Sequence, residues 1–268
     1  MAETETEARW TAPTATETPF PALSPGGVAL VTGGGRRLGK TICKDLAQLG
    51  FRVGVVYHRS QRSAEESAAE INQAGGDAHP IFLNLADPTQ IEDFLNESEY
   101  LLGKVPDLLI HNAALFQPTP MEDGSWDEMT SMIQVNLQGP LWLSLQTAQR
   151  MARHRGGQII TICDIWGERP LKGYTAYSAT KAGLIMTTRS LARELAPAVR
   201  VNAIAPGAIL PPDETTGQRA AAYHQLLAHT PLAGQADPSA VTHAIRYLLA
   251  AHYVTGEILH VDGGRQLL

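Results

Sequence analysis

The sequence predicts one α/β domain, a doubly wound parallel sheet with helices on both faces. Short runs rich in β-branched and apolar residues alternate with longer stretches whose apolar residues recur at helical spacing. Strands separated by helices of this length form parallel sheets that are buried on both faces. No internal repeat or interdomain linker interrupts this alternation after residue 28.

Composition narrows the classes of function. The 268 residues carry a formal net charge of −6, and no apolar run approaches the ~18 residues that a membrane span needs. The absence of a Lys/Arg stripe argues against nucleic acid as the main partner. The chain has two cysteines and begins without a basic segment followed by an apolar one, so we expect no disulfide framework and no secretory signal. These features predict a cytoplasmic protein with no membrane partner.

The amino-terminal residues differ from the rest of the chain in composition and periodicity. Residues 1–26 are rich in Thr, Glu and Pro and show little periodicity, which predicts a flexible leader. Residues 27–268 then form the domain. We expect strands at 28–33, 51–60, 79–85, 107–113, 158–164, 199–206 and 257–263. We expect helices at 37–50, 64–74, 89–102, 126–154, 175–195, 218–228 and 240–251.

A glycine-rich turn joins the first strand to the first helix. In that helix Leu38, Ile42, Leu46 and Leu49 share one face, as in an amphipathic helix. The turn runs through Gly33, Gly34 and Gly35, and a further glycine at position 39 lies on the opening turn of the helix. Glycines there let main-chain N–H groups approach a pyrophosphate at the helix amino terminus. A glycine turn alone is a weak signal, but its place in a β–α–β unit predicts a Rossmann-type dinucleotide site.

The end of the second strand indicates which dinucleotide binds. An NAD site usually carries Asp or Glu there for the ribose 2′-hydroxyl, whereas this chain has Tyr57, His58, Arg59 and Ser60. Arg59 and Ser60 can hydrogen-bond a 2′-phosphate that a carboxylate would repel. Arg37 would add positive charge near the phosphates. A solvated loop arginine is the simpler alternative for Arg59, and we favour NADPH.

Tyr177 and Lys181 are the candidate catalytic pair. They are four residues apart and so share one face of the predicted helix. A neighbouring ammonium favours phenolate, so we expect it to lower the pKa of the tyrosine. Asp164 follows a strand thirteen residues before Tyr177, and Asn136 lies inside the preceding long helix, where its amide would hold water or brace the main chain.

Taken together, these residues resemble the short-chain dehydrogenase/reductase family over residues 28–268. The opening glycines, Asn112-Ala113, Asn136, the Tyr177/Lys181 pair, Pro206-Gly207 and the closing Val261-Asp262-Gly263-Gly264 follow in the family's order. The resemblance implies that Asp164, Tyr177, Lys181 and Asn136 are catalytic. It implies a cofactor-binding set of Gly33, Arg37, Leu38, Gly39, His58, Arg59, Ser60, Asn84, Leu85, Asn112, Ala113, Tyr177, Lys181, Pro206 and Gly207.

The departures from the family pattern resemble its pteridine reductase branch, which includes dihydromonapterin reductases. Asp164 stands where a serine is usual, Arg37 replaces a loop glycine and His111 replaces an asparagine. By this resemblance Phe116, Asp164, Tyr174 and Tyr177 bind a pterin, with Phe116 stacking on its ring. Two simpler interpretations stay open: Asp164 as the cap of the next segment, and Phe116 as a core residue.

The residue chemistry agrees with that resemblance. A ketone reductase needs a neutral hydroxyl donor beside the carbonyl, and an ionised carboxylate cannot donate. A pterin C=N bond needs a proton on nitrogen, and a carboxyl group of raised pKa can assist, directly or through Tyr177. We therefore expect an NADPH-dependent reductase of dihydropteridines, extending to dihydrofolate. The alternatives are a carbonyl reductase of the same family and a pterin- or NADPH-binding regulator with little turnover.

Three further expectations complete the analysis. The nine histidines are dispersed without a metal-ligand spacing, so we expect no metal site. The stretch 209–235 follows the Pro-Gly turn and should cover the substrate. By resemblance, the chain forms a homotetramer through the helices predicted at 126–154 and 175–195.

Overall fold

Seven parallel strands form one sheet in the order β3-β2-β1-β4-β5-β6-β7. The computed structural model describes residues 26–120, 122, 124–211 and 218–268, so residues 1–25 of the predicted leader lie outside the described residues. The strand order reverses between β1 and β4, which is where sheets of this kind bind ligands, beyond the strands' carboxyl ends. The strands are β1 Val28–Thr32, β2 Arg52–Tyr57, β3 Asp77–Phe82, β4 Leu108–His111, β5 Gly157–Ile162, β6 Val199–Pro206 and β7 Ile258–Val261.

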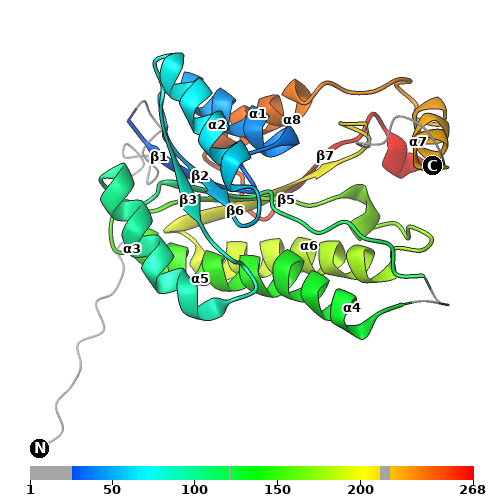
Figure 1. Cartoon of the computed structure of the whole chain (residues 1–268), viewed down its shortest axis with the longest axis horizontal. Helices are drawn as coiled ribbons and strands as arrows, with labels where there is room; N and C mark the ends of the chain where they lie inside the picture. The colour runs from blue at the N-terminus through cyan, green and yellow to red at the C-terminus, as the bar shows by residue number, and fades with distance from the viewer. Residues whose placement is uncertain (1–25, 121, 123, 212–217) are drawn as a thin grey trace, which may run out of the picture.

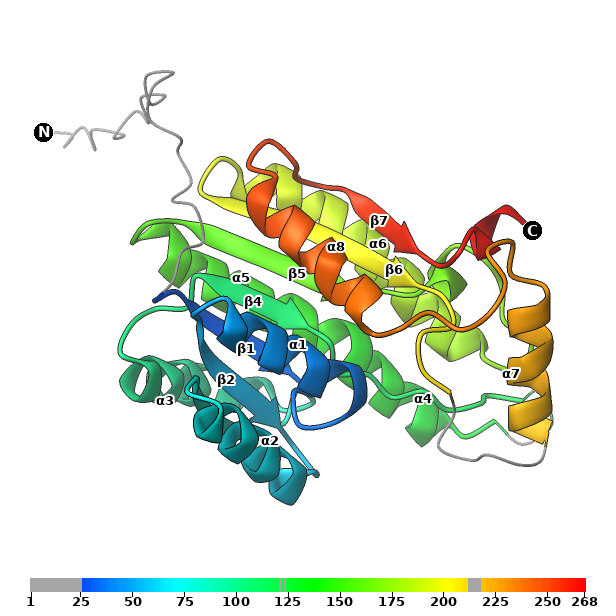
Figure 2. The same cartoon turned by 90° about the horizontal axis from the view of Figure 1, so that it is seen from above.

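Helices cover both faces of the sheet (Figure 1). The helices α1 Arg37–Gln48, α2 Gln61–Gln73 and α8 Ser239–Ala250 lie on one face. The other face carries α3 Ile91–Leu102, α4 Trp126–Ile133, α5 Gly139–Ala152 and α6 Thr175–Leu195. The short helix α7 Gln218–Ala228 lies beyond the carboxyl ends of β6 and β7 (Figure 2). Within the part of the chain that the structure describes, no helix is both long and apolar enough to cross a membrane.

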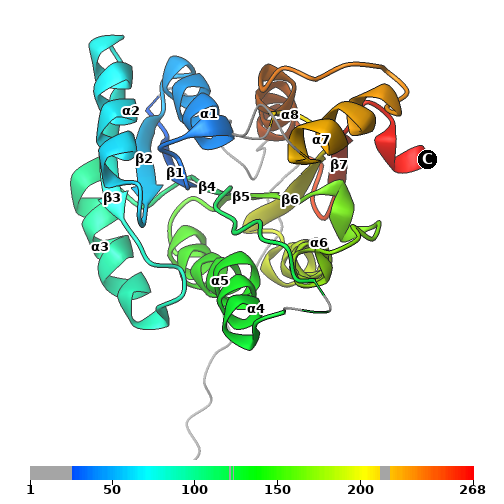
Figure 3. The same cartoon turned by 45° about the vertical axis from the view of Figure 1, so that its right-hand side comes forward.

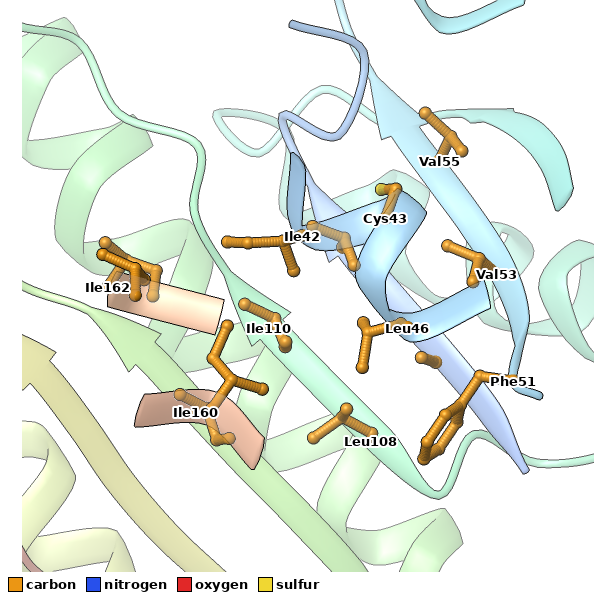
Figure 4. Packing of buried hydrophobic residues seen from close by; sticks show 14 of the residues in the cluster. Ile42, Cys43, Leu46, Phe51, Val53, Val55, Leu108, Ile110, Ile160 and Ile162 are labelled. Carbon is orange, nitrogen blue, oxygen red and sulfur yellow. The ribbon is translucent and has the colours of Figure 1, made fainter. Parts of the chain in front are cut away.

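Burial on both faces explains the apolar strands. Every residue of β1, β4 and β6 is buried, as expected where helices cover a parallel sheet from both sides. On one face, Ile42 and Leu46 of α1 pack toward strand residues such as Val53 and Ile110 (Figure 4). Each such fully buried side chain contributes roughly 1.5–3 kcal/mol relative to exposure. The predicted apolar face of the first helix is confirmed, with Leu38 and Leu49 partly buried at its ends.

The predicted elements are confirmed with one correction. The helix expected without interruption at 126–154 contains a π-helical turn, Gln134–Gln138, between α4 and α5. This turn includes the buried Asn136, whose side chain bonds to the main chain of a distant residue, Leu115. A tertiary contact of that kind leaves no mark on apolar periodicity, so the pattern predicted an ordinary helix.

Candidate active site

A cavity of about 540 Å³ opens at the carboxyl ends of β1, β2 and β4. Its volume falls within the range of about 300–1,000 Å³ that is typical of small-molecule sites. The predicted cofactor residues that line it are Gly33, Arg37, Leu38, Gly39, His58, Arg59, Ser60, Asn84, Leu85, Asn112 and Ala113. These predicted residues come from four separate stretches of sequence that meet at the point where the strand order reverses.

The glycine turn is shaped by close main-chain approach. Gly33 has φ of +65°, and a Cβ on it would lie 3.0 Å from the Cα of Ala113. A Cβ on Gly39 would overlap the main-chain oxygen of Gly33. The Asn112 amide nitrogen donates to the main-chain oxygens of Thr32 at 3.0 Å and Gly33 at 3.2 Å, which fixes the turn against β4. The resulting cradle beside the amino terminus of α1 has the form that accepts a pyrophosphate.

Arg37 holds an unusual main-chain conformation for a side-chain-bearing residue. Its φ of +50° lies in the left-handed region that favours glycine. Its guanidinium donates to the main-chain oxygen of Pro211 at 2.7 Å, so the rim of the glycine turn is joined to the segment that follows β6. Arg37 thus brings positive charge to the cavity at the cost of a strained main chain.

The far end of the cavity lies beyond β2. His58, Arg59 and Ser60 line it, and none of the described lining residues is acidic. Burial, and then the charge of Arg59, lower the pKa of His58. The guanidinium of Arg59 and the hydroxyl of Ser60 are hydrogen-bond donors at this end of the cavity.

Asp164 and Tyr177, which are not among the residues that line this cavity, form a short hydrogen bond with each other. The Tyr177 hydroxyl donates to Oδ2 of Asp164 at 2.6 Å. Oδ1 of the same carboxyl accepts from the main-chain N–H of Trp166 at 3.0 Å and so caps the short 3₁₀ turn Ile165–Gly167. Asp164 is therefore both the cap that the simpler interpretation predicted and the partner of the candidate catalytic tyrosine.

The pKa of Tyr177 is shifted in the direction opposite to the one expected. Burial raises the pKa of Asp164, and burial followed by the charge of Asp164 raises the pKa of Tyr177 well above its ordinary value. The expectation that Lys181 lowers the pKa of Tyr177 is therefore wrong for the free protein. Burial also lowers the pKa of Lys181 itself. Its ammonium donates to the main-chain oxygen of Ile162 at 2.9 Å and lies 5.6 Å from the centre of the Tyr177 ring.

Asn136 braces the main chain near the tyrosine. Its side chain accepts from the N–H of Leu115 at 2.7 Å and donates to the Leu115 oxygen at 2.8 Å. It also donates to Thr180 Oγ1 at 3.3 Å, and that hydroxyl donates to the main-chain oxygen of Tyr177 at 2.7 Å. Of the two roles predicted for this amide, the structure displays the bracing one.

Phe116 and Tyr174 form an aromatic wall. Their rings stack with centres 4.5 Å apart and planes 13° apart, and Phe116 meets Tyr177 edge-on at 4.7 Å. Phe116 is 55% exposed, so the interpretation of this residue as core is wrong. An exposed ring beside a buried acid–base pair can take a flat ligand on its face.

His111 lies at the end of β4 and contacts α5. It is fully buried at the end of β4, its Nε2 lies 2.7 Å from Ser144 Oγ, and burial lowers its pKa to about 3. Within the described ranges, no group of three or more His, Cys, Asp or Glu side chains is arranged to hold a metal ion. His111 is thus a neutral residue that joins the sheet to α5.

Several features of the site were missed in the sequence. Leu115, Ser131, Val135 and Leu210 also line the cavity, and Ser131 and Val135 come from the end of α4 and the π-helical turn. No local motif marks these four residues. Of the predicted stretch 209–235, residues 212–217 lie outside the described residues. The Pro206-Gly207 turn lies at the end of β6, where a Cβ on Gly207 would come within 2.9 Å of Asp262.

Solved structures of bacterial proteins share this architecture. FolM alternative dihydrofolate reductase 1 from Brucella canis, complexed with NADP, is 29% identical, covers 92% of this chain and 97% of its own, and has a TM-score of 0.85. A dehydrogenase/reductase from Sinorhizobium meliloti is 31% identical over 91% of this chain and 97% of its own, with a TM-score of 0.81. The similarity therefore extends over the whole domain.

Relatives in sequence include a reductase of a different kind. A 3-oxoacyl-(acyl-carrier-protein) reductase from Staphylococcus aureus is 34% identical over 242 residues, which is 88% of this chain and 96% of that protein. The short chain dehydrogenase family model matches residues 27–221. With its parallel sheet, its glycine cradle and its Tyr177/Lys181 pair, the chain belongs to the short-chain dehydrogenase/reductase family of oxidoreductases.

Proposed function

We propose that the protein is an NADPH-dependent reductase of dihydropteridines, of the dihydrobiopterin or dihydromonapterin kind and extending to dihydrofolate, which it converts to the tetrahydro forms. The 2.6 Å hydrogen bond between Tyr177 and Asp164 carries this proposal. A buried carboxyl beside the tyrosine is a proton store, and protonation of a ring nitrogen requires one.

The chain's own groups define how a proton would move. When bound, NADPH supplies the hydride that reduces a C=N bond. The Tyr177 hydroxyl, held by Asp164, donates the proton, and the raised pKa of the carboxyl lets Asp164 replace that proton. Lys181 binds the nicotinamide ribose in this proposal, and its charge stabilises the tyrosine as it gives up its proton.

The aromatic wall supports a flat substrate. The half-exposed ring of Phe116 lies beside Tyr177, with Tyr174 stacked parallel to it. A pterin placed on Phe116 would come within reach of the acid–base pair and would be sandwiched against the nicotinamide. An extended acyl chain would make no comparable use of two parallel rings.

Two other functions remain as alternatives. The 34% identity with a 3-oxoacyl-(acyl-carrier-protein) reductase favours a carbonyl reductase, in which Asp164 would only order water. A regulator that binds the pterin or NADPH with little turnover would have no need of a tyrosine held by a buried carboxyl and a buried lysine. The similarity to the FolM alternative dihydrofolate reductase supports the pterin proposal.

NADPH oxidation by the purified chain tests the proposal directly. We expect turnover with dihydrobiopterin and slower turnover with dihydrofolate, because the bulkier folate must also place its glutamate tail. A short 3-oxoacyl thioester should react poorly, since its extended acyl chain makes no comparable use of the parallel rings of Phe116 and Tyr174. Efficient reduction of the thioester without pterin turnover would favour the carbonyl reductase, and binding without any turnover would favour the regulator.

Arg59 should decide the cofactor preference. Replacing it in Arg59→Asp removes a charge-assisted contact to the 2′-phosphate and adds repulsion, so NADPH use should fall by roughly ten- to a hundredfold. NADH use should change little. Arg62→Asp is the matched control, because Arg62 is exposed on α2 and pairs with Glu66 at 2.8 Å. Steady-state kinetics with both cofactors measures the effect, and equal losses with NADPH and NADH would contradict the assignment.

Asp164→Asn should impair dihydropterin reduction by about 10²–10⁴-fold with little change in NADPH affinity, because an amide keeps the shape but has no carboxyl proton. Since burial raises the pKa of Asp164, the wild-type rate should fall as the pH rises through that raised value. The variant should lack this limb of its pH–rate profile.

Stability provides the control for this variant. A carboxyl with a raised folded-state pKa costs folding free energy as the pH rises from its unfolded value through the folded one. At neutral pH, Asp164→Asn should therefore unfold at the same temperature as the wild type or above it. Asp77→Asn, on the exposed start of β3, should leave turnover unchanged. If folded Asp164→Asn keeps near wild-type turnover across pH, then Asp164 acts only as the cap of the 3₁₀ turn.

We also propose a homotetramer that forms through the outer faces of α4, α5 and α6. Ile133, Trp142 and Met186 lie on these helices and are 40%, 44% and 58% exposed, so these helices have apolar surface available for a subunit contact. Light scattering at micromolar concentration should give four times the chain mass of 28.9 kDa. A monomer at that concentration would contradict the proposal.

The cytoplasm remains our proposed compartment, with residues 1–26 as a leader ahead of the domain. Cys43 and Cys163 are both free and buried, as is common where thiols stay reduced. Detection of the protein in the cytosolic fraction of lysed cells would support this, and recovery with membranes or medium would contradict it.

A further inference from the structure

The segment after Asp164 is held against α6 on one side. The 3₁₀ turn Ile165–Gly167 begins at Asp164, whose carboxyl caps it. A Cβ on Gly167 would lie 2.9 Å from the main-chain carbon of Lys181, so the turn packs directly on the helix that carries the catalytic pair. Any shift of this turn would move the carboxyl that bonds to Tyr177.

On its other side the same segment is tied to the carboxyl-terminal part of the chain. Glu168 pairs with His260 of β7 at 2.8 Å. The guanidinium of Arg169 donates to two main-chain oxygens, that of Arg265 at 2.7 Å and that of Leu268. The planar, forked guanidinium suits two acceptors at once, whereas an ammonium presents a single point charge.

Residues 262–268 form a compact turn that we call the closing turn. The Asp262 carboxyl accepts from the N–H groups of Gly264 at 2.9 Å and Gln266 at 2.6 Å, which fixes the shape of the turn. The Arg265 guanidinium donates to the oxygen of His229 at 3.0 Å, just beyond α7. Figure 3, like Figures 1 and 2, shows α7 beside the end of β7 and the closing turn.

We propose that Arg169 is a positioning residue that locks the Asp164 segment to the closing turn and, through Arg265, to the chain beyond α7. Asp164 would then meet Tyr177 in one fixed geometry, and the substrate side of the site would move as a single unit. Among the described residues, the bonds of the Arg169 and Arg265 guanidinium groups go to Arg265, Leu268 and His229 and do not reach β1, β2 or β4. The kinetic consequence rests on the proposed function, whereas the mechanical linkage does not.

The test compares Arg169→Met and Arg169→Lys with Arg246→Met. Arg246 is the matched control, because its guanidinium also makes two bonds, to Asp45 at 3.0 and 2.6 Å, but it joins α8 to α1 away from the substrate. For Arg169→Met we expect kcat with dihydrobiopterin to fall about tenfold, because a charge-assisted hydrogen-bonded link is lost, with unchanged NADPH affinity. Arg169→Lys should recover part of the rate, and Arg246→Met should keep all of it.

Hydrogen exchange provides a readout that needs no substrate. In Arg169→Met, peptides covering 164–174 and 262–268 should exchange faster, while the peptide covering 33–39 stays as in the wild type. Unchanged exchange in the first two peptides would overturn the proposal. So would an equal fall in kcat for Arg246→Met, because the effect would then be one of general stability.

If the wild type reduces only ketones, the proposed function fails, and the exchange pattern still decides the role of Arg169. Should Arg169→Met fail to fold, Arg169→Lys is read in the same way.

Discussion

The carboxyl group of Asp164 accepts the two hydrogen bonds on which the geometry of the proposed substrate side depends. One oxygen caps the turn after β5 and the other accepts the hydroxyl of Tyr177. Because both oxygens are engaged, the group cannot rotate without breaking either the local main-chain structure or the acid–base pair. Burial of this carboxyl costs free energy, and the raised pKa is the same cost expressed as proton affinity.

The proposed cofactor side and the proposed substrate side of the site differ in the groups that form them. The proposed cofactor side is shaped by main-chain groups brought close at Gly33 and Gly39, and polar side chains such as Arg59 line it. The side on which we propose that the substrate binds consists of side chains, among them Asp164, Phe116 and Tyr174. Relatives named for different substrates match this chain at 29% and 34% identity, so overall identity does not identify the substrate. The substrate must therefore be inferred from the few side chains of the proposed substrate side.

The sequence was informative wherever a property is local or periodic. Alternating apolar runs predicted the confirmed parallel sheet, and the spacing of Tyr177 and Lys181 predicted that they share a face of α6. Properties that depend on tertiary surroundings could not be predicted from the sequence. The pKa of Tyr177 reflects burial and a carboxyl thirteen residues away, which outweigh the nearby lysine. Arg169 reaches acceptors about a hundred residues along the chain, and no pattern within one segment encodes such a contact.

The π-helical turn Gln134–Gln138 places one extra residue in what would otherwise be a regular helix. Each residue in a helix turns the chain by about 100°, so the length of this one turn sets the rotation of all of α4 relative to α5. Loss of a single residue there would swing Ser131 away from the cleft and carry the amide of Asn136 off the main chain of Leu115. The helix is therefore more tolerant of substitution than of a change in length.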